Sequence, residues 1–105
     1  FGAKLLAEQY GNRAQLDRSR LFSGLDSYKR LLQTDIDVVL LCTPPAFRPE
    51  HLAAAIDASK HIYAEKPVAV DVPGVLSVLE SARLAKLKNL VILDGFCWRY
   101  DKANS

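Results

Sequence analysis

The sequence lacks the features that mark several large classes of protein. None of its apolar runs approaches the ~20 residues that a membrane-spanning helix needs, and the longest, residues 38–42, has the length of a strand. Its two cysteines, Cys42 and Cys97, are far apart, so we expect buried thiols rather than a disulfide or a metal site. His51 and His61 have no partner at metal-binding spacing, and we expect both to be structural. We therefore predict neither a metal nor a membrane span.

An excess of charge of one sign is also missing. The chain carries 14 Lys and Arg against 12 Asp and Glu, a net charge of +2, and its densest basic run, residues 13–20, includes Asp17. This is weaker than the clustered basic surface of a nucleic-acid-binding protein, so we expect no nucleic-acid partner. Half of the residues are hydrophobic and a quarter are charged, a composition typical of globular proteins. A length of 105 residues allows one domain at most.

Apolar periodicity predicts helices that alternate with short strands. We expect helices over residues 1–10, 26–32, 49–58 and 71–88, and strands over residues 20–23, 38–42, 61–64 and 90–93. Alternation with short connections predicts a parallel sheet, and the continuous apolar run at 38–42 predicts a strand buried on both faces. In the last helix we expect Asp71 to be the N-cap, with an inward stripe made of Val75, Val78, Leu79, Ala82 and Ala85.

Polar residues gather where three of these strands end. Thr43-Pro44-Pro45 follows the strand at 38–42, Glu65-Lys66-Pro67 follows the next strand, and Arg99 lies in the segment after the last. The carboxyl ends of parallel strands lie at one edge of a sheet, where open α/β folds bind their ligands. The pattern therefore predicts one site that combines a hydroxyl, a carboxylate, an ammonium and a guanidinium.

Each of these residues also has a plainer interpretation. Lys66 is either an acid or hydrogen-bond donor to a substrate hydroxyl or carbonyl, or a surface lysine paired with Glu65. Arg99 either clamps an anionic group or pairs with Asp101. Thr43 either contacts a cofactor or caps the helix that follows, and a cis peptide at Pro67, a minority state for such bonds, would fix the direction of the lysine.

Several motifs in this order resemble those of the Gfo/Idh/MocA family, which includes glucose–fructose oxidoreductase and inositol 2-dehydrogenase. They are DIDVVL from Asp35, TPP from Thr43, KHI from Lys60, EKP from Glu65 and GFCWRY from Gly95. The resemblance covers roughly residues 26–101, and the TPP and EKP motifs at this spacing are quite specific.

The resemblance implies an NAD(P)-dependent oxidoreductase with a Rossmann domain and a separate C-terminal α/β domain. Hydride would move between nicotinamide and the hydroxyl-bearing carbon of a sugar or polyol, with Lys66 as the catalytic residue that assists proton transfer. Contacts to NAD or NADP are implied for Thr43, Pro44, Pro45, Glu65, Lys66, Pro67 and Arg99. The partners implied are a small-molecule substrate and, for the full-length protein, further copies of itself, in a family that includes cytoplasmic and exported members.

The sequence departs from the family pattern in three ways. Arg48 stands where the family often has His, and Ser59 stands where it often has Gly. The larger departure is that the glycine-rich turn, the acid that binds the adenosine ribose and the C-terminal domain are missing. A strand near Phe22 would be the third of the full sheet, with no neighbour.

These departures lead us to expect a partial Rossmann fold. The predicted class is α/β, doubly wound and mainly parallel, without the first two strands, and residues 1–105 form the C-terminal portion of an NAD(P)-binding domain. Because the chain opens on Phe1 rather than Met, we expect an internal piece, inactive by itself and without tight dinucleotide binding. Two alternatives are a non-catalytic α/β module for binding or assembly and another Rossmann dehydrogenase, such as a homoserine dehydrogenase relative; the EKP motif argues against the second.

Overall fold

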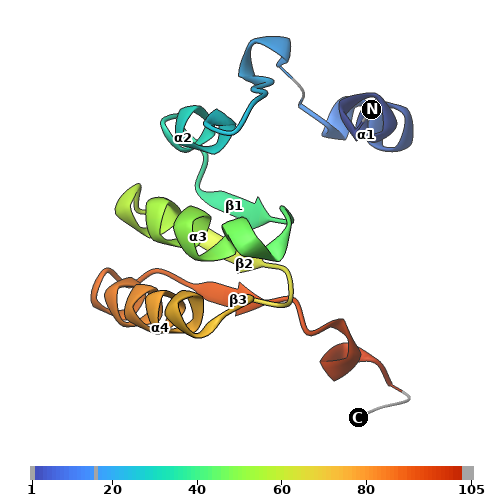
Figure 1. The fold of residues 1–105 in the computed structure, drawn as a ribbon. Helices are drawn as coiled ribbons and strands as arrows, with labels where there is room; N and C mark the ends of the chain where they lie inside the picture. Colours follow the sequence, from blue (N-terminus) through green and yellow to red (C-terminus); the bar gives the residue numbers. More distant parts are fainter. Residues whose placement is uncertain (1, 16, 103–105) are drawn as a thin grey trace. The chain divides into compact units, whose positions relative to one another are not determined.

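The computed structural model describes residues 2–15 and 17–102 (Figure 1). Phe1, the predicted start of the first helix, lies outside the described residues. The chain divides into two compact units, Phe1–Leu31 and Leu32–Ser105, and the residues of the predicted site all belong to the second.

The first unit contains helices and turns but not the strand predicted at residues 20–23. Helix α1 spans Gly2–Tyr10, the 3-10 turns η1 and η2 span Gly11–Arg13 and Arg18–Arg20, and α2 begins in this unit and spans Ser27–Leu32. The first helix is confirmed, although none of its residues is buried. The strand is wrong: Leu21 and Phe22 are irregular, because a strand needs a neighbour for its backbone groups and no strand pairs with them in the described chain.

The second unit is built on the predicted parallel sheet. Among the described residues the sheet has three strands, β1 (Val38–Leu41), β2 (His61–Ala64) and β3 (Ile92–Asp94), in the order β1-β2-β3. Leu41 is in register with Ala64, and Ala64 with Asp94. All three carboxyl ends therefore lie at the same edge of the sheet (Figure 1).

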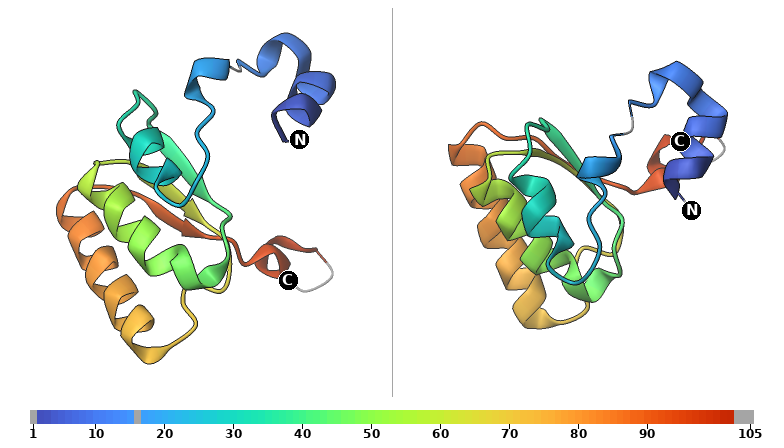
Figure 2. Two further views of the ribbon diagram at one scale, coloured as in Figure 1. Left: turned by 45° about the horizontal axis from the view of Figure 1, so that its top comes forward. Right: turned by 90° about the horizontal axis from the view of Figure 1, so that it is seen from above.

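Two helices cover one face of this sheet. Helices α3 (Arg48–Asp57) and α4 (Val72–Leu87) lie side by side, and α3 also packs on β1 and β2 (Figure 2). The core is apolar and comprises, from the sheet and α3, Val39, Leu41, Ile62, Ala64, Leu52, Ala55 and Ile56. The other face is open: Val38 is 52% and Leu40 66% exposed. The prediction that this strand is buried on both faces is therefore wrong, because no described element covers its second face.

The inward face of α4 differs from the predicted stripe. Asp71 is the N-cap as predicted, and its Oδ1 accepts a hydrogen bond of 2.7 Å from the Gly74 N–H. Of the predicted stripe, Ala85 is buried and Val78 half-buried, whereas Val75, Leu79 and Ala82 are exposed. Ser81 is the other buried residue of the helix. Small residues form the contact face because α4 lies close to α3: a Cβ on Gly74 would come within 3.1 Å of Pro49 Cγ.

At the C-terminal end of α3, Ser59 occupies the position where the family often has glycine. Ser59 has a φ of 56°, in the left-handed region that glycine usually fills. Its N–H donates to the Ile56 carbonyl, and the Lys60 N–H donates to the Ala55 carbonyl. The C-terminal turn of the helix is thus kept with serine in place of glycine.

Candidate active site

The structure brings the three predicted strand ends together. The N–H of Glu65 donates to the Leu41 carbonyl over 3.0 Å, and the N–H of Gly95 donates to the Ala64 carbonyl over 2.8 Å. These bonds continue the ladder one residue past β2 and β3. The segments that begin at Cys42, Glu65 and Gly95 therefore leave the sheet as neighbours, which confirms the predicted convergence.

Thr43, in the loop after β1, is held through both its backbone and its side chain. Nη2 of Arg48 donates to the Thr43 carbonyl, and Thr43 Oγ1 shares a 3.1 Å hydrogen bond with Nδ1 of His51. Arg48 and His51 are three residues apart in α3 and therefore lie on one face of it. The alternative that Thr43 caps this helix is wrong, because its hydroxyl is bound to His51 and Phe47 occupies the N-cap position without a side-chain bond.

The two residues that hold Thr43 are buried. Arg48 is 1% exposed, and its Nε and Nη1 have no hydrogen-bond partner among the described residues. His51 is 7% exposed and stacks on Phe47, with ring centroids 5.8 Å apart. Burial lowers the pKa of His51, and the nearby charge of Arg48 lowers it further against the opposing effect of Glu50, so the imidazole is neutral at pH 7.

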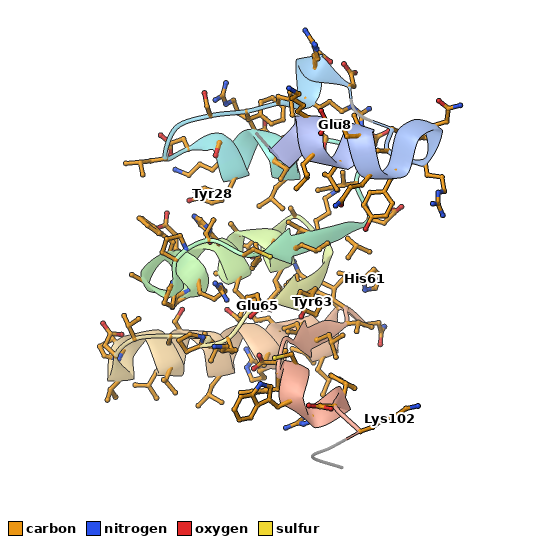
Figure 3. The ribbon with its side chains drawn as sticks, turned by 90° about the vertical axis from the view of Figure 1, so that its right-hand side faces the viewer. Glu8, Tyr28, His61, Tyr63, Glu65 and Lys102 are labelled. Atoms are coloured by element: carbon orange, nitrogen blue, oxygen red, sulfur yellow. The ribbon has the colours of Figure 1, made fainter. Side chains whose placement is uncertain are left out.

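The carboxylate of Glu65 is fixed at the end of β2 by both of its oxygens. Oε1 accepts a hydrogen bond of 3.3 Å from the Tyr63 hydroxyl, and Oε2 accepts one of 3.1 Å from the Lys66 N–H (Figure 3). Burial, followed by the charge of Glu65, raises the pKa of Tyr63, so the phenol keeps its proton and remains a donor. Tyr63 therefore orients the Glu65 carboxylate. The EKP motif predicted the position of Glu65 along the chain but not this contact.

Gly95 lies against this pair from the end of β3. A Cβ at this position would lie 2.7 Å from the Tyr63 hydroxyl oxygen and 2.9 Å from Glu65 Oε1. Both distances are shorter than an ordinary Cβ contact, so a larger residue at this position would have to displace the ends of the Tyr63 and Glu65 side chains. Tyr63, Glu65 and Gly95 thus form one packed cluster across β2 and β3.

Lys66 and Arg99 each lie in a segment that follows a strand, and neither has an acidic partner among the described residues. Lys66 is exposed and bonds Glu65 only through its backbone N–H, so the alternative of a Lys66–Glu65 surface pair is wrong. The Lys66–Pro67 peptide is cis, as considered for this motif. Arg99 is exposed with its guanidinium 5.4 Å from the centre of the Phe96 ring, rather than in a pair with Asp101.

The remaining sequence expectations concern cysteines, histidines, metals and membranes. Cys42 and Cys97 are free thiols, but both are exposed, so the prediction of buried thiols is wrong: each follows the end of a strand, outside the helix-covered core. His61 is structural as predicted, with Nδ1 accepting from the Val91 N–H over 3.0 Å. Across residues 2–15 and 17–102 no group of three or more metal-ligating residues is present, and no helix is long and apolar enough to cross a membrane.

Sequence reasoning placed Thr43, Glu65 and Lys66 but missed the residues that hold them. Arg48 was noted only as a departure from a family motif, His51 only as a structural residue and Tyr63 only as part of a strand. The signal for Arg48 was its place in the first turn of a helix that follows a strand-end loop. No local signal links Tyr63 and Gly95, because they meet only once two strands pair.

Comparison with known proteins gives a consistent result. Residues 3–93 match the model of the family described as "Oxidoreductase family, NAD-binding Rossmann fold" (GFO_IDH_MocA). Inositol 2-dehydrogenase 3 of Saccharopolyspora erythraea is 42% identical over 67 residues, which cover 64% of this chain and 19% of that protein. D-glucoside 3-dehydrogenase of Escherichia coli is 35% identical over 81 residues, 77% of this chain and 21% of that protein.

Solved structures show the same likeness. Scyllo-inositol dehydrogenase from Lactobacillus casei, with bound cofactor NAD(H) and scyllo-inositol, superposes with a TM-score of 0.64 at 27% identity, over 72% of this chain and 22% of that one. Myo-inositol 2-dehydrogenase from Lactobacillus plantarum superposes with a TM-score of 0.63 at 30% identity, over 71% and 22% of the two chains. The chain thus spans about a fifth of the length of the relatives that it matches.

Proposed function

The chain belongs to the Gfo/Idh/MocA family of oxidoreductases, whose matching domain has an NAD-binding Rossmann fold, and we propose that it is the C-terminal portion of such a domain in a nicotinamide-dependent dehydrogenase. The observation that carries the proposal is that Thr43, Glu65 and Lys66 lie in segments that leave β1 and β2 at hydrogen-bonded, neighbouring strand ends. In open α/β sheets this edge is where ligands bind.

The described residues suit the nicotinamide end of a dinucleotide. We propose that Thr43, Pro44 and Pro45, after β1, and Glu65 and Pro67, after β2, border the ring, together with Arg99 from the segment after β3. Gly95, at the start of that last segment, packs against Tyr63 and Glu65. The pyrophosphate end is different: the five glycines of the chain form no glycine-rich turn. We assign these seven residues, Lys66 included, to cofactor contact, with NAD and NADP as the two candidates.

Lys66 carries the proton chemistry of the proposal. When bound, the nicotinamide supplies the site at which hydride is gained or lost. In reduction, the Lys66 ammonium would donate a proton from Nζ to the oxygen of the substrate carbonyl; in oxidation, the amine form would take that proton back from the hydroxyl while hydride passes to the oxidised nicotinamide. Glu65, fixed by Tyr63 and by the Lys66 N–H, holds the segment from which the lysine side chain extends.

The substrate class that we propose is a sugar or polyol. The relatives named inositol 2-dehydrogenase 3 and D-glucoside 3-dehydrogenase, and the neighbour with bound scyllo-inositol, favour a polyhydroxylated ring. For the full-length protein we also propose self-association into a homo-oligomer.

The test is Lys66→Ala in the full-length protein, assayed against inositols and hexoses with NAD and NADP. Loss of a proton-transfer group predicts a fall in kcat of about 10²–10⁴-fold. The matched control is Lys86→Ala, which removes an exposed lysine from α4 and should leave kcat unchanged. Unchanged turnover in Lys66→Ala would show that the role assigned to Lys66 is wrong.

A second candidate is a non-catalytic module of the same fold, used for binding or assembly. The observation that favours it is the open apolar face of β1, where Val38 and Leu40 are exposed. Full-length protein that binds a nicotinamide cofactor yet oxidises none of the polyols or sugars tested would favour this candidate over the dehydrogenase.

A further inference from the structure

Arg48 is a buried cation that the fold itself does not neutralise. The side chain is 1% exposed, and Nη2 makes its single hydrogen bond, to the Thr43 carbonyl. Nε and Nη1 have no partner, and no acid forms an ion pair with Arg48 within residues 2–15 and 17–102. Burial of an unpaired charge is costly, so a positive charge at this position calls for a functional explanation.

The charges around Arg48 do not cancel it. His51, on the same helix turn, is buried and neutral. Glu50 is exposed to solvent, and the carboxylate of Glu65 is already bound by Tyr63 and the Lys66 N–H. Asp94 has one buried oxygen without a partner, but it ends β3, two strands away from β1. Neighbouring strands are about 4.8 Å apart, so Asp94 lies about 10 Å along the sheet from the strand that leads to Thr43.

The loop that Arg48 supports is the one assigned above to the nicotinamide. The two oxidation states of that ring differ by one positive charge, which the oxidised ring carries and the reduced ring lacks. A fixed positive charge in a low-dielectric setting therefore disfavours the oxidised ring relative to the reduced one. We propose that Arg48 is a specificity-determining residue that biases this site toward the reduced form of a nicotinamide cofactor; the inference rests on the proposed function.

The expected effect follows from the size of such an interaction. For the estimate, the charges of Arg48 and of the oxidised ring are taken to be about 10 Å apart, at an effective dielectric constant of about 20. Their repulsion then changes the binding constant of the oxidised cofactor by roughly tenfold. Removal of the charge should therefore tighten binding of the oxidised cofactor by about tenfold relative to the reduced one. A residue that only holds the loop would instead change the two affinities by the same factor.

The experiment measures binding, not turnover, in the full-length protein. Dissociation constants for NAD⁺, NADH, NADP⁺ and NADPH are determined by calorimetry and cofactor fluorescence in the wild type and four variants. Arg48→Gln removes the charge and keeps an amide donor for the Thr43 carbonyl, and Arg48→Met removes both. Arg48→Lys keeps the charge, and Arg83→Met removes a matched charge from an exposed position on α4.

We expect the ratio of oxidised to reduced dissociation constants to differ among these variants according to whether the charge is kept. In Arg48→Gln and Arg48→Met the ratio of oxidised to reduced dissociation constants falls about tenfold, whereas Arg48→Lys and Arg83→Met keep the wild-type ratio. Equal changes in both constants would overturn the proposal and leave the proposed function intact. A wild type that binds none of the four cofactors would overturn the proposed function and this inference together. Circular dichroism identifies any variant that does not fold, and Arg48→Gln and Arg48→Met each test the ratio independently.

Discussion

At the scale of single residues, Gly95 allows the segment after β3 to pack closely against Tyr63 and Glu65 at the end of β2. An alanine there would place its Cβ 2.7 Å from the Tyr63 hydroxyl and 2.9 Å from Glu65 Oε1. Because both atoms are ends of side chains that can shift, we expect Gly95→Ala to lower the free energy of unfolding by about 1 kcal/mol, the usual cost of disturbing one hydrogen bond, here that between Tyr63 and Glu65. Urea denaturation of the full-length protein, followed by circular dichroism, measures this loss.

The cause of that loss is tested in a second background. Tyr63→Phe removes the oxygen atom closest to the added Cβ, so Gly95→Ala should cost less in Tyr63→Phe than in the wild type. Gly2→Ala is the matched control, because nothing lies within 4 Å of its Cβ position. An equal cost of Gly95→Ala in both backgrounds would mean that Tyr63 is not the obstacle.

These contacts mark the limit of what the sequence could predict about the site. Short motifs placed Thr43, Glu65 and Lys66 at strand ends, and strand order then brought them together. The contacts of Tyr63 with Gly95, and of Arg48 with Thr43, join residues from different elements. They depend on how closely strands and helices approach one another, and no spacing along the chain encodes that distance.

At the scale of secondary-structure elements, β1 separates two environments in adjacent residues. Leu41 is 5% exposed beneath α3, whereas Leu40 is 66% exposed on the open face. Leu41→Ala should therefore lower the free energy of unfolding by about 2–5 kcal/mol, the cost of a core leucine. Leu40→Ala, the same substitution one residue earlier, should change it by less than about 0.5 kcal/mol.

Thermal or urea unfolding of the 105-residue chain compares the two variants directly. Similar losses in both would contradict the one-sided burial of β1. The same pair in the full-length protein then reports on the open face: a larger cost for Leu40→Ala there than in the 105-residue chain would mean that another segment covers it.

The elements show which sequence signals are reliable. Helical periodicity predicted α3 and α4, and short β-branched runs predicted β1 and β2, since these patterns are local. The strand at residues 20–23 and the two-sided burial of β1 were wrong, and the predicted face of α4 was right only at Ala85 and in part at Val78. Each depended on a neighbour: a pairing strand, a covering layer, or the close approach of α3 that favours Gly74 and Ser81 over larger side chains.

At the scale of the whole molecule, the proposed function gives the chain one part of what dinucleotide binding requires, the contacts to the nicotinamide end. Its sheet of three described strands has three strand-end segments, to which the proposed function assigns the nicotinamide. In such folds most hydrogen bonds to the dinucleotide come from a glycine-rich turn and a helix N-terminus, which bind the pyrophosphate. The 105 residues contain no turn of that kind.

Because the phosphate-binding turn is not among these 105 residues, we expect the isolated chain to bind a dinucleotide much more weakly than the full-length protein does. The 105-residue chain should bind NADH or NADPH no more tightly than about 1 mM, because the contacts to the nicotinamide end alone leave the pyrophosphate in water. Fluorescence titration of the purified chain measures this limit, with circular dichroism to confirm that it is folded. Full-length protein in the same titration is the control and should bind far more tightly. Micromolar binding by the isolated chain would contradict the prediction, since the strand-end segments around Thr43, Glu65 and Arg99 would then suffice without a phosphate-binding turn.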